Sequence, residues 1–175
     1  DVAVGFADAD VSVERAYETP TVHQGYIEPH ATTVRFDDNG PSMIWCPTQG
    51  HFDVRARVAQ LLNMELGQIK VVASEIGGGF GGKTTVYLEP VALILSKKSG
   101  RPVKMTMSRE DVFRASGPAS ASQSTVKIGA KSDGTITAMQ ASLHYEAGAF
   151  KGSPMGPGCM TIFTPYDVEN MYVEG

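Results

Sequence analysis

The sequence contains little cysteine and no long apolar run. Its two cysteines, Cys46 and Cys159, lie far apart and outside any C-x-x-C pattern. This usage indicates neither a disulfide scaffold nor a cysteine metal site, and it is typical of a protein from a reducing cytoplasm. No apolar run approaches the roughly 20 residues of a membrane-spanning helix, so we expect no membrane partner.

The sequence also lacks an excess of positive charge. Its 15 Lys and Arg residues stand against 19 Asp and Glu residues, which gives a net charge of -4 at pH 7. Domains that bind nucleic acid usually carry a basic patch, so we expect no nucleic-acid partner. The histidines show no H-x-x-x-H or other ligand spacing, and a lone histidine is more often structural than a metal ligand. They are His23, His30, His51 and His144.

The apolar pattern predicts an α+β fold, a mixed sheet with β-hairpins packed against two main helices. Strand-like runs cover residues 32–36, 42–46, 69–73, 102–107, 124–130 and 135–145. Turn residues separate the first two runs and the last two, so each pair predicts a hairpin. Two runs have helical periodicity. The first has its apolar face at Val54, Val58, Leu61 and Leu62 and ends by Gly67, and the second has its face at Leu88, Val91, Ala92 and Leu95 and ends at Gly100.

The length suits a single domain over residues 1–175. Residues 1–24 alternate short apolar and acidic stretches, which indicates short strands, a linker or an extended arm. Residues 148–158 are rich in Gly, Pro and Ser, so we expect a functional loop or a crossing segment rather than a regular element. The chain's last ten residues resemble a strand.

The most restricted stretch of the sequence runs from Glu75 to Pro90, EIGGGFGGKTTVYLEP. Glycine permits positive φ and lets another molecule approach the backbone closely, at a cost in conformational entropy. Residues 77–84 match the phosphate-binding pattern G-x-x-x-x-G-K-[ST] between a predicted strand and a predicted helix. A nucleotide-binding P-loop is therefore one hypothesis, and a tight structural turn is another.

The position of Pro90 argues against the P-loop. In a P-loop the helix begins around the lysine, here Lys83, so that its first amides meet phosphate. Pro90 would then lie about two turns inside the helix, at a cost of roughly 3 kcal/mol or more. A helix that begins near Tyr87 places Pro90 in its first turn instead.

From about Gly25 to the end, the chain resembles the molybdenum-binding subunit of the xanthine dehydrogenase and aldehyde oxidase family, the molybdenum hydroxylases. The resemblance is carried by YIEPHATTV, WCPTQGHF, GGGFGGK, GRPVKMTMSRED and YEAGAFKGSPMGPG. Its specificity comes from an ordered pair of motifs, a TQ at the end of a strand and the glycine loop, whose Phe80 follows Gln49 by 31 residues.

The resemblance implies roles for particular residues. Gln49 would donate its amide to the apical oxygen on molybdenum, and Gly79, Phe80 and Gly81 would line the cofactor, with Phe80 also bordering the substrate. None of them is a direct metal ligand. A neutral amide and bare backbone amides suit an oxo group, because they donate without adding negative charge. His30 would shape the approach to the site.

One position departs from part of the family. Members that oxidise purines carry a Glu directly after the GGK, and Thr84 stands there in this chain. We therefore expect Thr84 to lie in the substrate pocket and xanthine to be a poor substrate.

The resemblance further implies cofactors and partners. The cofactor would be molybdopterin or molybdopterin cytosine dinucleotide with Mo, and 2Fe-2S and FAD would sit in partner subunits or domains. The general base of the family, a Glu, would lie outside this chain. We expect a fragment of a molybdenum subunit that is inactive by itself and joins the rest of that subunit to hydroxylate a small-molecule substrate. The alternative functions are a P-loop nucleotide-binding domain and a non-catalytic binding module.

Overall fold

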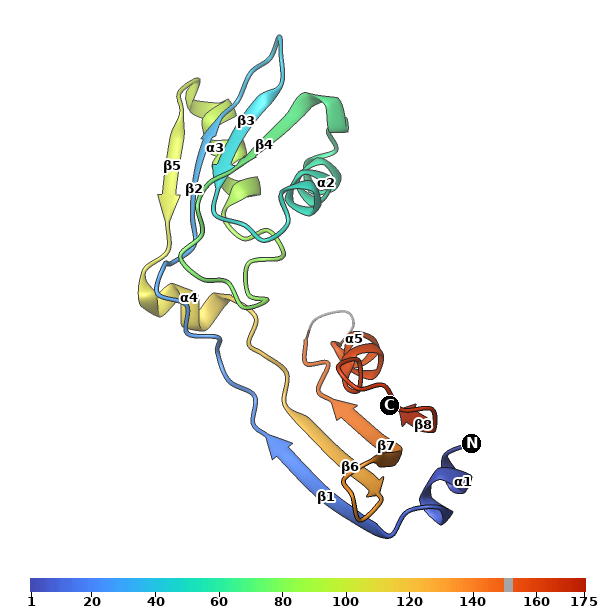
Figure 1. Cartoon of the computed structure of the whole chain (residues 1–175). Coiled ribbons are helices and arrows are strands. Elements are labelled where there is room, and N and C mark those ends of the chain that lie inside the picture. Colours follow the sequence, from blue (N-terminus) through green and yellow to red (C-terminus); the bar gives the residue numbers. More distant parts are fainter. Residues whose placement is uncertain (150–152) are drawn as a thin grey trace. The chain divides into compact units, whose positions relative to one another are not determined.

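The computed structural model describes residues 1–149 and 153–175, and its elements form two compact units (Figure 1). Unit 1 comprises residues 1–22 and 120–175, and unit 2 comprises residues 23–119. Each unit contains a four-stranded sheet and helices. The α+β class is confirmed, and the strands belong to two sheets.

Unit 2 contains the glycine loop and both main helices. Its sheet has the order β4-β3-β2-β5, in which β3 and β4 are parallel and the other neighbours are antiparallel. The parallel pair follows from helix α2, which connects β3 to β4. The elements are β2 (Ala31–Arg35), β3 (Ser42–Cys46), α2 (His51–Leu62), η1 (Leu66–Gln68), β4 (Ile69–Ala73), α3 (Glu89–Ser99), β5 (Val103–Thr106) and α4 (Arg109–Ala115).

The core of unit 2 joins the sheet to α2 and α3. Alternate residues of β3 are buried, which is the period of a strand with one face on the core. Val54 and Val58 lie one helical turn apart in α2 and are fully buried. The core consists of Val34, Ile44, Cys46, Val54, Val58, Ala59, Ile69, Ala92 and Leu93.

Two helix details differ from the sequence prediction. Helix α2 ends at Asn63 instead of near Gly67, because Asn63 adopts the left-handed conformation (φ 51°) that asparagine tolerates. In α3 the buried face is rotated, so that Leu93 is buried whereas Val91 and Leu95 are exposed. Two polar residues on this face, Glu89 and Ser96, are buried, and an apolar pattern cannot identify them.

The ends of α3 agree with the prediction. Pro90 lies in its first turn, and Gly100 ends it with φ 65°. The hairpin between β2 and β3 is also confirmed. Ser108 caps the short helix α4.

Unit 1 contains the second predicted hairpin. Its sheet has the order β1-β6-β7-β8, with β7 and β8 parallel. Gly134, at the turn between β6 and β7, has φ 93°, which glycine adopts without strain. The elements are α1 (Val2–Ala7), β1 (Val11–Thr19), β6 (Ser122–Ala130), β7 (Ile136–Tyr145), α5 (Met155–Thr161) and β8 (Met171–Glu174).

Two segments of unit 1 differ from the expectation. Residues 2–7 are helical, because the Asp1 carboxylate accepts a hydrogen bond from the Ala3 amide at 2.9 Å and caps the helix. Residues 155–158, the last part of the loop expected over residues 148–158, belong instead to α5 (Met155–Thr161). Packing against β7 stabilises α5, whose Gly158 lies against the Tyr145 ring. Residues 150–152 of that predicted loop lie outside the described residues.

Across residues 1–149 and 153–175, none of the helices has both the length and the apolar character needed to span a membrane.

Candidate functional site

The glycine loop follows β4 and adopts backbone conformations that explain its composition. Gly78 and Gly81 have φ of 92° and 90°, and Phe80 between them has φ 49°. Positive φ is free of steric strain only for glycine. The loop therefore needs glycine at two of these positions and holds Phe80 in an unusual conformation at its tip.

The Gln49 side chain is anchored on this loop. Its Oε1 accepts hydrogen bonds from the Gly81 amide at 3.0 Å and from the Lys83 amide at 3.1 Å. Both groups are obligate donors, so the oxygen of the Gln49 amide must face them and the NH₂ group must face away. The two N–H donors of that NH₂ group have no partner among the residues that the structure describes.

Two other glycines of the loop leave no room for a side chain. A Cβ on Gly79 would lie 2.5 Å from Gln49 Oε1, and a Cβ on Gly82 would lie 2.7 Å from the Tyr26 ring. Both glycines are buried. The close approach of Gln49 to the loop therefore depends on the absence of a Cβ at Gly79.

The remaining predicted site residues lie at the exposed rim of the loop. Phe80 is 72% exposed, and a Cβ on Gly81 would meet no atom within 4 Å. Thr84 is exposed, but its hydroxyl donates back to the Gly81 carbonyl at 3.1 Å. The structure thus brings together Gln49, Gly79, Phe80, Gly81 and Thr84.

Lys83 turns away from the rim. Its side chain is 1% exposed, and Nζ lies 2.8 Å from the Glu28 carboxylate and 4.9 Å from the centre of the Tyr26 ring. A P-loop lysine must reach phosphate oxygens, and the helix behind it must begin nearby. Since Lys83 is buried in an ion pair and α3 begins only at Glu89, the nucleotide-binding hypothesis is not supported.

A hydrogen-bonded chain of polar side chains lies beside this ion pair. The buried Tyr26 hydroxyl contacts His30 Nε2 at 2.7 Å and Ser116 Oγ at 3.2 Å, and Ser116 contacts His23 Nε2 at 2.9 Å. Burial, assisted by the charge of Lys83, lowers the pKa of His30 to about 4. His30 is therefore neutral at pH 7. It supports the loop through Tyr26, whose ring packs against Gly82.

Sequence reasoning missed two residues of this support. It singled out His30 within residues 28–30, whereas Glu28 contacts the loop directly and Tyr26 packs under Gly82. The available signal was their place in YIEPHATTV, one of the motifs that carry the resemblance.

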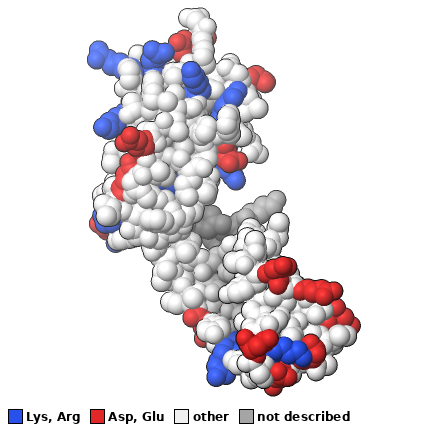
Figure 2. All heavy atoms as spheres, viewed as in Figure 1, with Lys and Arg blue, Asp and Glu red and all other residues white. Residues whose placement is uncertain are grey.

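The rim fits the anionic, oxygen-rich cofactor that the resemblance implies. The Gln49 NH₂ group can donate to such a cofactor. Gly81 leaves open space where another residue would have a side chain. Unit 1 carries 10 Asp and Glu against 4 Lys and Arg, whereas unit 2 carries 9 against 11. The site therefore lies on the slightly basic unit. On the face drawn in Figure 2, the Lys and Arg side chains (blue) lie scattered among Asp and Glu side chains (red).

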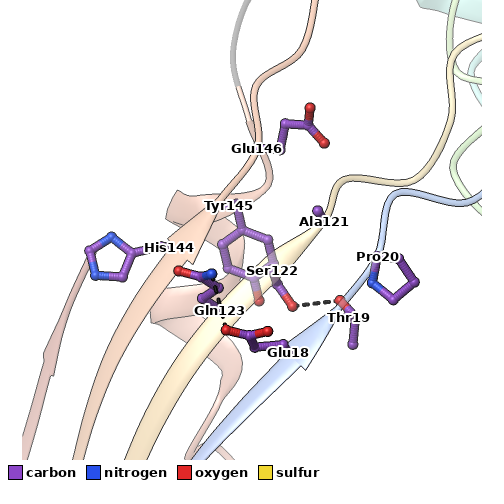
Figure 3. Close-up of a pocket in the computed structure, with 9 residues that line it drawn as sticks. All are labelled: Glu18, Thr19, Pro20, Ala121, Ser122, Gln123, His144, Tyr145 and Glu146. Carbon is purple, nitrogen blue, oxygen red and sulfur yellow. Dashed lines mark hydrogen bonds between the residues drawn. The ribbon is translucent and has the colours of Figure 1, made fainter.

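Unit 1 contains a cavity of about 610 Å³ (Figure 3). Four of its polar side chains are paired, since Gln123 donates to Glu18 at 3.1 Å and the hydroxyls of Thr19 and Ser122 lie 2.8 Å apart. It contains none of the predicted site residues. Within the described part of the chain, no three His, Cys, Asp or Glu side chains converge as a metal site.

Comparison with known proteins shows the family to which this chain belongs. The family model of the molybdopterin cofactor-binding domain matches residues 1–175. The probable hypoxanthine oxidase XdhD of Escherichia coli O157:H7 is 34% identical over 159 residues, which cover 91% of this chain and 16% of that protein. The nicotinate dehydrogenase large molybdopterin subunit of Eubacterium barkeri is 31% identical over 180 residues, 99% of this chain and 42% of that protein.

A solved structure shares the fold. Quinoline 2-oxidoreductase from Pseudomonas putida 86 superposes with a TM-score of 0.79 at 22% identity, over 99% of this chain and 24% of that chain. The chain thus spans less than half the length of these relatives. It belongs to the molybdopterin cofactor-binding domain family of the molybdenum hydroxylases.

Proposed function

We propose that Gln49 and the glycine loop form one wall of a molybdenum-cofactor site in a larger hydroxylase. The observation that carries the proposal is the Gln49 amide, whose oxygen is held by two loop amides and whose NH₂ group is left to donate. That NH₂ group would donate to an oxygen of the cofactor. Phe80 and Gly81 would border the cofactor, and Gly79 allows Gln49 to lie close to them.

When bound, the cofactor supplies the two-electron redox chemistry. The chain's own part is to orient it. A neutral amide donor stabilises a cofactor oxygen without a competing negative charge, and Gln49 is preorganised because its oxygen is already satisfied. Exposed Phe80 offers an apolar surface on which a flat substrate could rest.

The complete enzyme would hydroxylate an aldehyde or an aromatic or heterocyclic carbon with water-derived oxygen and pass electrons to 2Fe-2S centres. FAD, the catalytic Glu and the rest of the molybdenum subunit would come from outside this chain. The cofactor would be molybdopterin or its cytosine dinucleotide form. The two free cysteines, Cys46 and Cys159, are in keeping with a cytoplasmic enzyme.

Thr84 would lie at the substrate side of the site and disfavour purines. Its hydroxyl already donates to Gly81, so it offers a substrate an acceptor but no free donor. Replacing Thr84 with Glu in the complete enzyme is expected to raise purine turnover. Equal purine turnover by both forms would contradict this role for Thr84.

The test of the cofactor site separates the two halves of the Gln49 amide. Gln49→Glu keeps an acceptor for the Gly81 and Lys83 amides but removes the NH₂ donors and adds negative charge, whereas Gln49→Ala removes both. The complete subunit is produced in a host that makes the cofactor, and its molybdenum and pterin contents are measured. We expect Gln49→Glu to lower molybdenum content about tenfold or more with the fold intact.

Gln60→Glu is the matched control, because Gln60 is exposed on α2 of the same unit and the change adds the same charge. It should leave molybdenum content unchanged. Full molybdenum content in Gln49→Glu would overturn the role of Gln49. A complete subunit that never contains molybdenum would favour a non-catalytic binding module.

A further inference from the structure

We propose that the Glu28–Lys83 ion pair holds the two ends of the glycine loop (residues 77–83) together. In this way it fixes the direction in which the side-chain amide of Gln49 points. Lys83 belongs to the most conspicuous motif of the sequence, yet it does not reach the exposed rim. Glu28 and Lys83 are therefore positioning residues, which act through Gln49. Their effect on the cofactor rests on the proposed function, whereas their effect on the loop does not.

Glu28 holds the first end of the loop in two ways. Its backbone amide donates to the Gly77 carbonyl at 3.2 Å, and its carboxylate oxygen Oε2 accepts from the Gly77 amide at 2.7 Å. A Cβ on Gly77 would lie 2.6 Å from the Glu28 Cβ. The segment of Glu28 and the start of the loop are therefore in close contact.

Lys83 holds the other end of the loop, also in two ways. Its backbone amide donates to the side-chain oxygen Oε1 of Gln49 at 3.1 Å, and its backbone carbonyl accepts from the backbone amide of Gln49 at 2.9 Å. The Lys83 carbonyl also accepts from the Thr48 hydroxyl at 3.1 Å. The position of Lys83 therefore fixes both the backbone and the side chain of Gln49.

The ion pair connects these two ends. Lys83 Nζ donates to Oε2 of Glu28 at 2.8 Å, the same oxygen that accepts from Gly77. Between the two ends, a single backbone hydrogen bond, Gly82 to Gly79 at 2.7 Å, is internal to the loop. Glycine-rich backbone has a large conformational entropy, so few other contacts oppose its opening.

The burial of the Lys83 side chain strengthens its contact with Glu28. Its cation lies over the Tyr26 ring, and the same ring packs against Gly82. A charge-assisted hydrogen bond at a site shielded from water is stronger than a neutral one. Neutralising either partner should therefore loosen residues 77–83 and release the Gln49 amide from its fixed direction.

The experiment compares Glu28→Gln, Lys83→Met and the double variant in the full chain without cofactor. Glu28→Gln is informative because its amide oxygen can still accept from Gly77, so only the charge is lost. Hydrogen exchange of the Gly77, Gly81 and Lys83 amides is measured residue by residue by NMR, together with the side-chain NH₂ signals of Gln49. Lys104→Met, on the exposed side of the edge strand β5, is the matched control.

We expect exchange of the loop amides to rise about tenfold or more in each single variant, because the charge-assisted contact is worth more than the RT ln 10 that this factor represents. The double variant should add little to either single change, since both remove the same contact. Amides of β2 and β3 should stay far more protected than those of an unfolded chain, which shows that each variant is folded. Whichever single variant folds decides the test.

Exchange within twofold of the unaltered chain in the folded variants would overturn the inference. Molybdenum content of the same variants, measured in the complete subunit, separates the two proposals. Faster loop exchange in the variants, together with an unaltered complete subunit that never binds molybdenum, would support the role of the ion pair in holding the loop and overturn the cofactor site. Unchanged exchange would overturn the role of the ion pair whether or not molybdenum is bound.

Discussion

Glu28 and Lys83 form an ion pair whose two ends differ sharply in exposure. The Lys83 side chain is 1% exposed and the Glu28 side chain is 34% exposed, although their charged atoms lie 2.8 Å apart. Water can therefore solvate the carboxylate if its partner is lost, but it cannot reach the ammonium group in the same way. The two ends of the pair should respond differently to substitution.

We expect Glu28→Gln to destabilise unit 2 more than Lys83→Met. Removing the negative charge leaves a buried cation without its partner, which costs about 3 kcal/mol. Removing the cation leaves a carboxylate that water can reach, with a loss of about 1–2 kcal/mol. Urea unfolding followed by fluorescence measures this, because the single tryptophan, Trp45, lies in β3 of unit 2. The reverse order of free energies of unfolding would contradict the argument.

Gly79→Ala is expected to destabilise unit 2 by about 2 kcal/mol. The new Cβ would lie 2.5 Å from Gln49 Oε1, so the Gln49 side chain would have to move and give up its two hydrogen bonds to the loop, each worth about 1 kcal/mol. Gly67→Ala is the control, since a Cβ there meets no atom within 4 Å. It should change the free energy of unfolding by less than about 0.5 kcal/mol. Equal effects of the two substitutions would show that Gly79 is not required for the approach of Gln49.

Acid should destabilise unit 2 through His30. Burial, with a contribution from Lys83, lowers the pKa of this histidine from 6.5 to about 4, so between these values the unfolded chain binds more protons than the folded one. The free energy of unfolding from this source is constant above pH 6.5, falls as the pH drops from 6.5 to 4, and is lower by about 3 kcal/mol in total. The charged or titratable groups that act on His30 are Lys83, His23 and Glu28.

His30→Gln tests this assignment because glutamine can still hydrogen-bond the Tyr26 hydroxyl but does not titrate. Urea unfolding at a series of pH values should show a shallower slope for the variant between pH 6.5 and 4. Parallel curves for the two proteins would assign the acid sensitivity to other groups.

Cys46 should resist thiol reagents until the protein unfolds. Its thiol is buried beside Glu89, and burial first and that carboxyl group second raise its pKa to about 12. The reactive thiolate is therefore almost absent at pH 8. In Cys159→Ser, where Cys46 is the remaining cysteine, Ellman's reagent should react only after denaturant is added. Rapid reaction of the folded variant would show that unit 2 opens around Cys46.

The sequence predicts most regular elements because their patterns are local. Period-two burial in β3, the turn before Gly134 and the proline in the first turn of α3 are properties of short stretches. The buried face of α3 was not predictable, because Glu89 and Ser96 are buried through contacts with distant segments. Glu89 lies beside the Cys46 thiol, and Ser96 accepts a hydrogen bond from the Phe36 amide.

The same division holds for the candidate site. The sequence alone determined the glycine loop, the spacing from Gln49 to Phe80 and the family. The residues of a motif and the order of the motifs can be read directly along the chain. Tertiary structure alone decided where Lys83 points. The motif is compatible with an exposed lysine at phosphate, and only the fold brings Glu28, 55 residues earlier in the chain, beside it. An ion pair between distant residues depends on three-dimensional proximity, which no local pattern encodes.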